Sequence, residues 1–111
     1  MNNEMIEISD CFVKALNPVR IYLFGSFAYG IPNENSDYDF YIVVSDEYTS
    51  RQVTDLYDIA YAALPSGRSR PVDILISTKS DFEKKKDSWP MEFTVLRKGA
   101  VLYDTDNRNV A

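Results

Sequence analysis

Hydrophobic residues near the start of the chain recur at the spacing of one face of an α-helix. Within residues 3–16 they form a single stripe, made of Met5, Ile8, Phe12, Val13 and Leu16. This period predicts an amphipathic helix that ends at Asn17-Pro18. A second stripe, made of Val53, Leu56, Tyr57, Ala60 and Leu64, predicts a helix from about Ser50 to Leu64. Pro65-Ser66-Gly67 closes that segment.

Four runs rich in β-branched and aromatic residues predict strands at 20–24, 38–44, 71–76 and 99–103. The first run stops abruptly at Gly25-Ser26. The run 38–44 is nearly continuously apolar, which is typical of a strand covered on both faces. We therefore expect helices on both sides of the sheet, with the helix over 50–64 as the crossover between the second and third strands.

Two shorter helices are predicted between the last two strands. Ser80 and Glu83 have the spacing of a capping box, which would begin one helix at Ser80. Pro90 suits a first helical turn and Gly99 a C-terminal stop, which bounds the other. Residues 104–111 read as a polar tail. The order of elements predicts a small α/β sandwich in which helices flank one sheet.

Length and composition narrow the possible functions. At 111 residues we expect a single domain over 1–111. The chain has no histidine, which excludes histidine bases and His-ligated zinc. Its formal charge of −5 argues against nucleic-acid binding, which needs a dense basic face. A lone cysteine, Cys11, no membrane-length apolar run and no signal-like start together favour a cytoplasmic protein.

Three carboxylates interrupt or adjoin the predicted strands. Asp37 and Asp39 stand at the start of the second strand and Asp73 inside the third. Side chains alternate along a strand, so Asp37 and Asp39 point to the same face, roughly 6.6 Å apart. If Asp73 lies on a neighbouring strand, the three would repel one another by about 4 kcal/mol per pair. This arrangement favours a hard cation such as Mg²⁺ held by the carboxylates and by substrate phosphates. For Asp37 alone, an ordinary turn residue is the alternative.

Gly25 and Ser26 are candidates to bind the phosphates of a substrate held at such a metal site. A glycine turn after a strand lets a phosphate approach backbone N–H groups and a hydroxyl, so these residues are candidates for binding a triphosphate. A two-metal site beside it would activate an attacking oxygen and stabilise departing pyrophosphate. The predicted reaction is nucleotidyl transfer, with Asp73 as the general base.

The motif and its spacing resemble one known superfamily. Leu23-Phe24-Gly25-Ser26, ten further residues, and Asp37-Tyr38-Asp39 followed by an apolar strand are similar to the signature of the DNA polymerase beta-type nucleotidyltransferases. Asp73 on the next strand and the Gly99–Tyr103 ending resemble its small branch, the minimal nucleotidyltransferases. The resemblance runs over nearly the whole chain and implies the polymerase beta-type fold, with a small mixed sheet and flanking helices.

The resemblance also implies roles for individual residues. Asp37, Asp39 and Asp73 would be catalytic Mg²⁺ ligands of a two-metal site, and Gly25 and Ser26 would bind the phosphates of ATP or another NTP. Ser36 either contacts phosphate or closes a turn. Relatives often carry an arginine shortly after Gly-Ser, where this chain has Phe27-Ala28-Tyr29. Arg68 and Arg70 are candidates to replace that arginine, and the alternative is that they are ordinary solvated loop residues.

The small size of the chain bears on how the acceptor of the nucleotidyl group would be recognised. Superfamily members that recognise an acceptor themselves carry an added domain, whereas minimal nucleotidyltransferases resemble antitoxins paired with a helical toxin of the HEPN (higher eukaryotes and prokaryotes nucleotide-binding) class. The resemblance therefore implies that the chain transfers NMP, with AMP from ATP expected first, to a hydroxyl group of that partner. The expected acceptor residue is a tyrosine, and the two proteins are expected to form a hetero-oligomer. The alternatives are an antitoxin that blocks its partner without catalysis and a nucleotidyltransferase that modifies a small molecule such as an antibiotic.

Overall fold

The structure, a computed structural model, describes residues 2–105. In chain order the elements are α1 (Asn3–Leu16), β1 (Arg20–Phe24), α2 (Ser26–Tyr29), β2 (Tyr38–Val44), α3 (Ser50–Ala63), β3 (Val72–Thr78), α4 (Lys79–Lys85), α5 (Pro90–Lys98) and β4 (Ala100–Asp104). The four strands and the helices α1, α3, α4 and α5 follow one another in the predicted order, and the short α2 follows the predicted turn at Gly25-Ser26. The predicted α/β class with flanking helices is confirmed.

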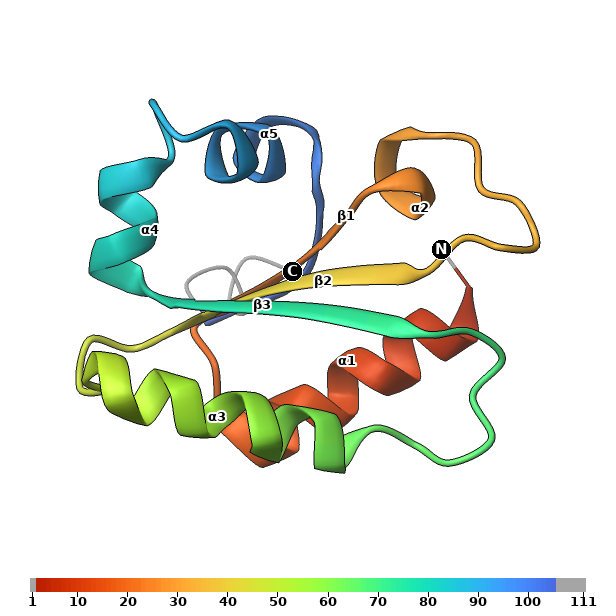
Figure 1. Cartoon of the computed structure of the whole chain (residues 1–111), viewed down its shortest axis with the longest axis horizontal. Helices are drawn as coiled ribbons and strands as arrows, with labels where there is room; N and C mark the ends of the chain where they lie inside the picture. Colours follow the sequence, from red (N-terminus) through yellow and green to blue (C-terminus); the bar gives the residue numbers. More distant parts are fainter. Residues whose placement is uncertain (1, 106–111) are drawn as a thin grey trace.

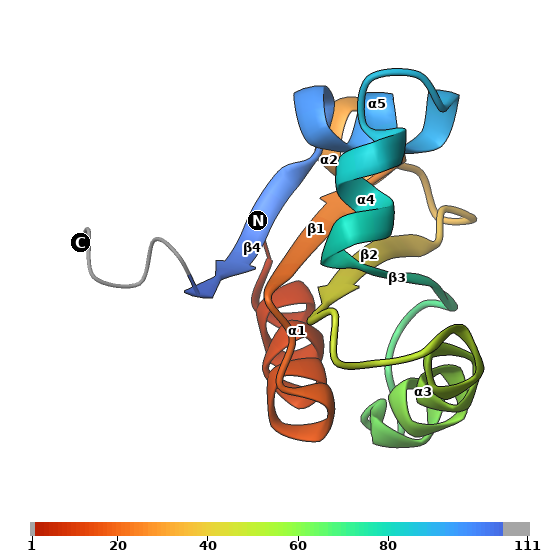
Figure 2. The same cartoon turned by 90° about the vertical axis from the view of Figure 1, so that its left-hand side faces the viewer.

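The four strands form one mixed sheet in the order β3-β2-β1-β4. β1 pairs antiparallel with both β2 and β4, whereas β2 and β3 run parallel. A parallel pair needs a crossover connection, and α3 provides it. α1 and α3 lie side by side on one face of the sheet, and α2, α4 and α5 lie on the other (Figures 1 and 2).

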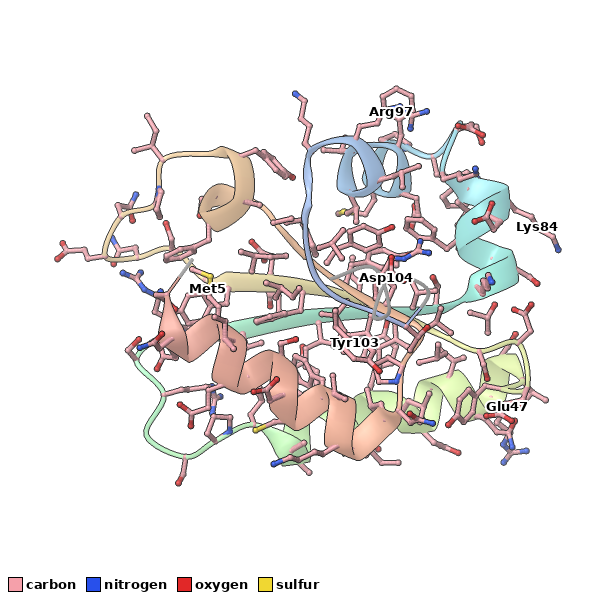
Figure 3. The ribbon with its side chains drawn as sticks, turned by 180° about the vertical axis from the view of Figure 1, so that it is seen from behind. Met5, Glu47, Lys84, Arg97, Tyr103 and Asp104 are labelled. Carbon is pink, nitrogen blue, oxygen red and sulfur yellow. The ribbon has the colours of Figure 1, made fainter. Side chains whose placement is uncertain are left out.

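Side-chain alternation along the strands divides the core between the two faces of the sheet. Leu23, Phe40 and Ile42 point toward α1 and α3, where they pack with the buried stripe of α1. Figure 3 shows Met5 of that stripe at the start of α1, on the side that faces the sheet. Tyr41 and Val43 point to the opposite face, toward α4 and α5. Both faces of β2 are therefore covered, as its continuous apolar run predicts.

A buried polar chain fastens α5 to the sheet. The Tyr41 hydroxyl donates to Glu92 Oε2 at 2.7 Å and lies 2.9 Å from Ser77 Oγ. Glu92 is only 7% exposed although it is charged. Because a buried carboxylate without a partner is costly, this contact ties α5 to β2.

The predicted start of α4 is wrong by two residues. Thr78 caps α4, and its hydroxyl accepts the Asp81 N–H at 3.3 Å. Ser80 instead donates from its N–H and hydroxyl to Asp46, at 2.8 and 2.6 Å. The end of β3 has already turned the chain at Thr78, so the tertiary contact with Asp46 replaces the local capping box.

The predicted tail also begins too early, because Asp104 belongs to β4 and its carboxylate lies 3.2 Å from Arg20 Nε. Residues 106–111 of the predicted tail lie outside the described residues. Within residues 2–105, every helix is too short or too polar to cross a membrane.

Candidate active site

Asp39 and Asp73 face each other on neighbouring strands. They are direct partners in the parallel register of β2 and β3, and their side chains project to the face that carries α2 and α5. The two carboxyl groups are close enough to share a hydrogen bond. Asp73 is exposed, since β3 forms an edge of the sheet, whereas Asp39 is partly buried. The structure therefore brings together two of the three predicted carboxylates.

Gly25 lies against Asp39 at the end of β1. Phe24, the last residue of β1, pairs with Asp39 in the antiparallel register. Gly25 then turns the chain with φ +73°, in the left-handed region that favours glycine. A Cβ at this position would collide with Asp39 Oδ2. Glycine is needed here both for the turn and for the close approach to the carboxylate.

Burial and the neighbouring carboxylates destabilise the charged form of Asp39. Burial, the charges of Asp73 and Asp37, and the hydrogen bond with Asp73 together raise the pKa of Asp39 from 3.8 to about 6. Burial is the largest of these causes, and the charge of Asp73 comes next. Near neutral pH the ionised form of Asp39 is therefore energetically unfavourable, and a bound cation would stabilise it.

Asp37 lies just outside β2, in the loop before Tyr38. Its charge acts on Asp39, but the three carboxylates do not converge. Within residues 2–105, no three side chains of histidine, cysteine, aspartate or glutamate lie close enough to hold a metal ion as they stand. The fold by itself therefore brings Asp39 and Asp73 together. The role of Asp37 as a third metal ligand stays a prediction.

The predicted phosphate-binding hydroxyls differ in their contacts. Ser26 begins α2 directly after Gly25, and among the described contacts its hydroxyl makes no hydrogen bond. The Ser36 hydroxyl accepts the Asn33 N–H at 2.9 Å, while the Ser36 N–H donates to Asn33 O at 3.1 Å. In this structure Ser36 thus closes the turn before Asp37.

Of the two candidate arginines, Arg70 has structural contacts. Its Nη1 donates to Asn33 O at 2.7 Å and to Ser36 O at 3.0 Å. Its guanidinium also lies 4.9 Å from the centre of the Phe27 ring. Arg70 therefore joins α2, the loop before Asp37 and the segment that leads into β3. Arg68, in the same loop, is exposed.

A cavity of about 300 Å³ opens beside the paired carboxylates. Its lining consists of Phe24, Asp39, Tyr61, Asp73, Ile74, Leu75 and Met91. The cavity is therefore polar at the carboxylates and mainly apolar along its walls. Sequence reasoning missed the wall residues. Tyr61 lies one position after Ala60 of the α3 stripe, and Met91 lies in the first turn of α5. No local sequence pattern reveals that both line the cavity beside the same two carboxylates.

Tyrosines from α3 satisfy hydrogen-bonding groups along the free edge of β3. The Ile74 N–H donates to the Tyr61 hydroxyl at 3.2 Å, and the Ile76 N–H donates to the Tyr57 hydroxyl at 2.9 Å. The Tyr57 hydroxyl also donates to Ile76 O at 3.4 Å. These contacts place the Tyr61 side chain at the sheet edge, next to Asp73.

A second cavity, of about 330 Å³, lies at the other end of β3. It is lined by Tyr48, Thr49, Ser50, Val53, Ile76, Ser77, Thr78, Asp81 and Lys85. It contains none of the residues predicted for catalysis. Asp39 and Asp73 line the smaller cavity and Gly25 lies against Asp39, so this end of the sheet is the candidate active site.

Comparisons with known proteins bear on the family and the fold. A family model described as "Polymerase beta, Nucleotidyltransferase" matches residues 7–108. No curated protein matches the chain significantly. A crystal structure of a toxin-antitoxin with AMP-PNP is similar at a TM-score of 0.56 and 21% identity, over 96% of this chain and 77% of that one. A mutant of the toxin-antitoxin MntA-HpeT is similar at 0.55 and 19%, over the same shares of the two chains. At this identity the two structures show a shared fold.

Proposed function

This chain belongs to the polymerase beta nucleotidyltransferase family, and from that premise we propose that it transfers AMP from ATP to a hydroxyl group of a partner protein. The observation that carries the proposal is the pairing of Asp39 with Asp73 directly beside the Gly25 turn, at the floor of one cavity. This is the combination that nucleotidyl transfer needs: a place for charged phosphates next to carboxylates that can handle a cation and a proton.

In the proposed reaction, the acceptor oxygen forms a bond to the α-phosphorus of ATP as the bond from that phosphorus to the bridging oxygen breaks. Pyrophosphate leaves with the bonding electron pair. Asp73 accepts the proton of the acceptor hydroxyl, which its exposed position at the sheet edge permits. Gly25 and Ser26 bind the departing phosphates, supported by the close backbone approach at Gly25 and by the Ser26 hydroxyl.

The residues present fit Mg²⁺. Their oxygen donors suit a hard cation, and such a cation would stabilise the Asp39 carboxylate, whose pKa is raised by burial and then by the charge of Asp73. We propose that Asp39 and Asp73 hold the metal, with Asp37 joining them. When bound, Mg²⁺ would neutralise phosphate charge and activate the acceptor oxygen.

The nature of the partner is inferred from the neighbouring structures. Both similar structures come from toxin-antitoxin pairs, and one contains the ATP analogue AMP-PNP. In the other, two aspartates two positions apart were replaced by glutamate, the same spacing as between Asp37 and Asp39. We propose that this chain is the antitoxin of such a pair, that the acceptor is a tyrosine of a HEPN-type toxin, and that the pair acts in the cytoplasm, where ATP is available.

Labelled ATP tests this function. The chain would be co-expressed with the product of its neighbouring reading frame, and the purified pair incubated with Mg²⁺ and ATP labelled at the α- or the γ-phosphate. We expect the α-label on the partner and the γ-label in pyrophosphate, with both signals lost in Asp39→Asn. Label from the γ-phosphate on the partner would contradict nucleotidyl transfer. Equal labelling of an aminoglycoside alone would favour the small-molecule alternative.

A further inference from the structure

The strand order fixes the direction from which an acceptor can reach the site. Gly25, Asp39 and Asp73 stand on or directly after three adjacent strands, β1, β2 and β3, whose neighbours are separated by about 4.8 Å. The three residues therefore form a row across the sheet, with the phosphate-binding turn at one end and Asp73 at the other.

The geometry of in-line displacement relates this row of residues to the direction of attack on the phosphorus. The attacking and leaving oxygens must lie on opposite sides of the phosphorus. If the departing phosphates lie at Gly25 and Ser26, as the proposed function requires, the attacking oxygen has to approach from beyond Asp73. Among residues 2–105 no further strand lies beyond Asp73, because β3 is the edge strand next to β2.

Two exposed side chains flank this free edge from opposite faces of the sheet. Tyr61 projects from α3, which covers one face, and Met91 from α5, which covers the other. Both line the cavity, and they are 44% and 42% exposed. Tyr61 is held at the edge by its hydrogen bond from the Ile74 N–H, and α5 is held by the buried contact between Glu92 and Tyr41. The two side chains are thus positioned on either side of Asp73.

We propose that the partner inserts its acceptor side chain across the free edge of β3, between Tyr61 and Met91. This inference rests on the proposed function and adds the entry route and the residues that select the acceptor. The cavity is continuous with the carboxylates, and its walls are apolar at Phe24, Leu75 and Met91. It therefore suits a hydroxyl carried on a long, largely apolar side chain.

Two pairs of substitutions, one pair on α5 and one on α3, distinguish this entry route from general effects of changing the surface. Met91→Trp would fill the mouth of the cavity, and Phe93→Trp serves as its control because Phe93 lies on the same helix, is 43% exposed and does not line the cavity. Tyr61→Ala would remove the opposite wall, and Ile59→Ala is the corresponding control on α3, where Ile59 is 46% exposed. Each variant would be measured for transfer to the co-expressed partner and for binding of α,β-methylene-ATP with Mg²⁺.

We expect Met91→Trp and Tyr61→Ala to lower kcat/KM for the partner at least tenfold, with binding of the ATP analogue within twofold of wild type. Both controls should keep wild-type values. The route is wrong if Met91→Trp and Phe93→Trp transfer equally well, or if analogue binding falls in parallel with transfer, because the cavity would then hold the nucleotide base. If the wild-type protein labels no partner, the proposed function itself fails, and the route fails with it.

Discussion

At the scale of single residues, Asp39 illustrates a conflict between stability and function. Its pKa is raised to about 6, chiefly by burial and then by the charge of Asp73. The rise from 3.8 corresponds to about 3 kcal/mol of unfavourable free energy at neutral pH. Since the carboxyl group is only partly buried, screening by water reduces this to about 1 kcal/mol.

We therefore predict that Asp39→Asn abolishes transfer but stabilises the metal-free protein. In EDTA at pH 7 its melting temperature should exceed that of wild type by about 4 °C. The sign follows from linkage: a carboxyl whose folded pKa is raised costs stability above that pKa, and the cost disappears as the pH falls below 3.8. The difference in melting temperature should therefore shrink from pH 7 to pH 4. An unchanged or lower melting temperature at pH 7 would show that the carboxylates do not repel.

Arg70 is predicted to position the loop that precedes Asp37. Arginine can donate to two carbonyls while it stacks on Phe27, whereas lysine cannot reproduce that planar contact. Arg70→Lys and Arg70→Gln should each lower the transfer rate about tenfold, and Arg68→Gln should have little effect. If Arg70 instead binds the triphosphate by its charge, Arg70→Lys would keep most of the activity and Arg70→Gln would mainly weaken ATP binding, as calorimetry can measure.

The residues predicted from sequence were those whose chemistry conflicts with their setting. Asp39 and Asp73 interrupt apolar strands and Gly25 stops one, so each is visible without a structure. Tyr61, Met91 and Arg70 are ordinary in their local sequence, on helices or in a loop. Their place at the site depends on tertiary packing that brings α3, α5 and the loop before β3 to the same strand ends.

At the scale of elements, Glu4 connects the first turn of α1 to the loop before β3. Glu4 Oε1 accepts the Tyr38 hydroxyl at 2.6 Å, and Oε2 accepts the Ser69 N–H at 2.9 Å. The Ser69 hydroxyl also donates to Glu4. The hydrogen bonds from Ser69 and then from Tyr38 hold the pKa of Glu4 below its ordinary value of 4.5. α1 is thereby tied to the segment that enters β3 ahead of Asp73.

Glu4→Gln should accordingly lower the melting temperature by a few degrees at pH 7. A carboxyl with a depressed pKa contributes stability above its ordinary value and loses it as the pH falls through the folded pKa. The difference between wild type and Glu4→Gln should thus be largest above pH 4.5 and shrink in more acidic solution. Thermal unfolding followed by circular dichroism across this range provides the measurement, with Glu7→Gln on the same helix as control. A constant difference at all pH values would exclude the ionised contact.

The elements themselves were largely predictable because each local signal agrees with the tertiary contacts. The bounds of α1, β1 and β2 follow the hydrophobic pattern, and Pro90 and Gly99 bound α5 as expected. The prediction failed at α4, where Ser80 and Glu83 form a plausible capping box but Asp46 binds Ser80. A contact between residues distant in sequence overrode the local signal there, and sequence pattern alone carries no record of such a contact.

At the scale of the whole molecule, charge is unevenly distributed. Lys84 and Arg97 lie on α4 and α5, on the side turned away from the sheet (Figure 3). Lys84 is exposed, whereas Lys85 lies 5.0 Å from the centre of the Trp89 ring and Lys86 pairs with Glu83 at 3.3 Å. The free edge of β3, by contrast, carries the carboxylates and the apolar cavity walls. The candidate catalytic residues therefore lie toward one edge of the sheet, where the proposed partner would dock.

The central claim is that this sheet edge transfers AMP to a protein hydroxyl through Asp73. Intact-mass spectrometry of the partner, co-expressed with either wild type or Asp73→Asn, tests it most directly. With wild type, we expect the partner to gain the mass of one or more AMP groups on a hydroxyl residue. With Asp73→Asn, which adds no bulk at an exposed position, the partner should keep its unmodified mass while still binding the chain. An AMP adduct of equal yield with Asp73→Asn, or an unmodified partner with wild type, would contradict it.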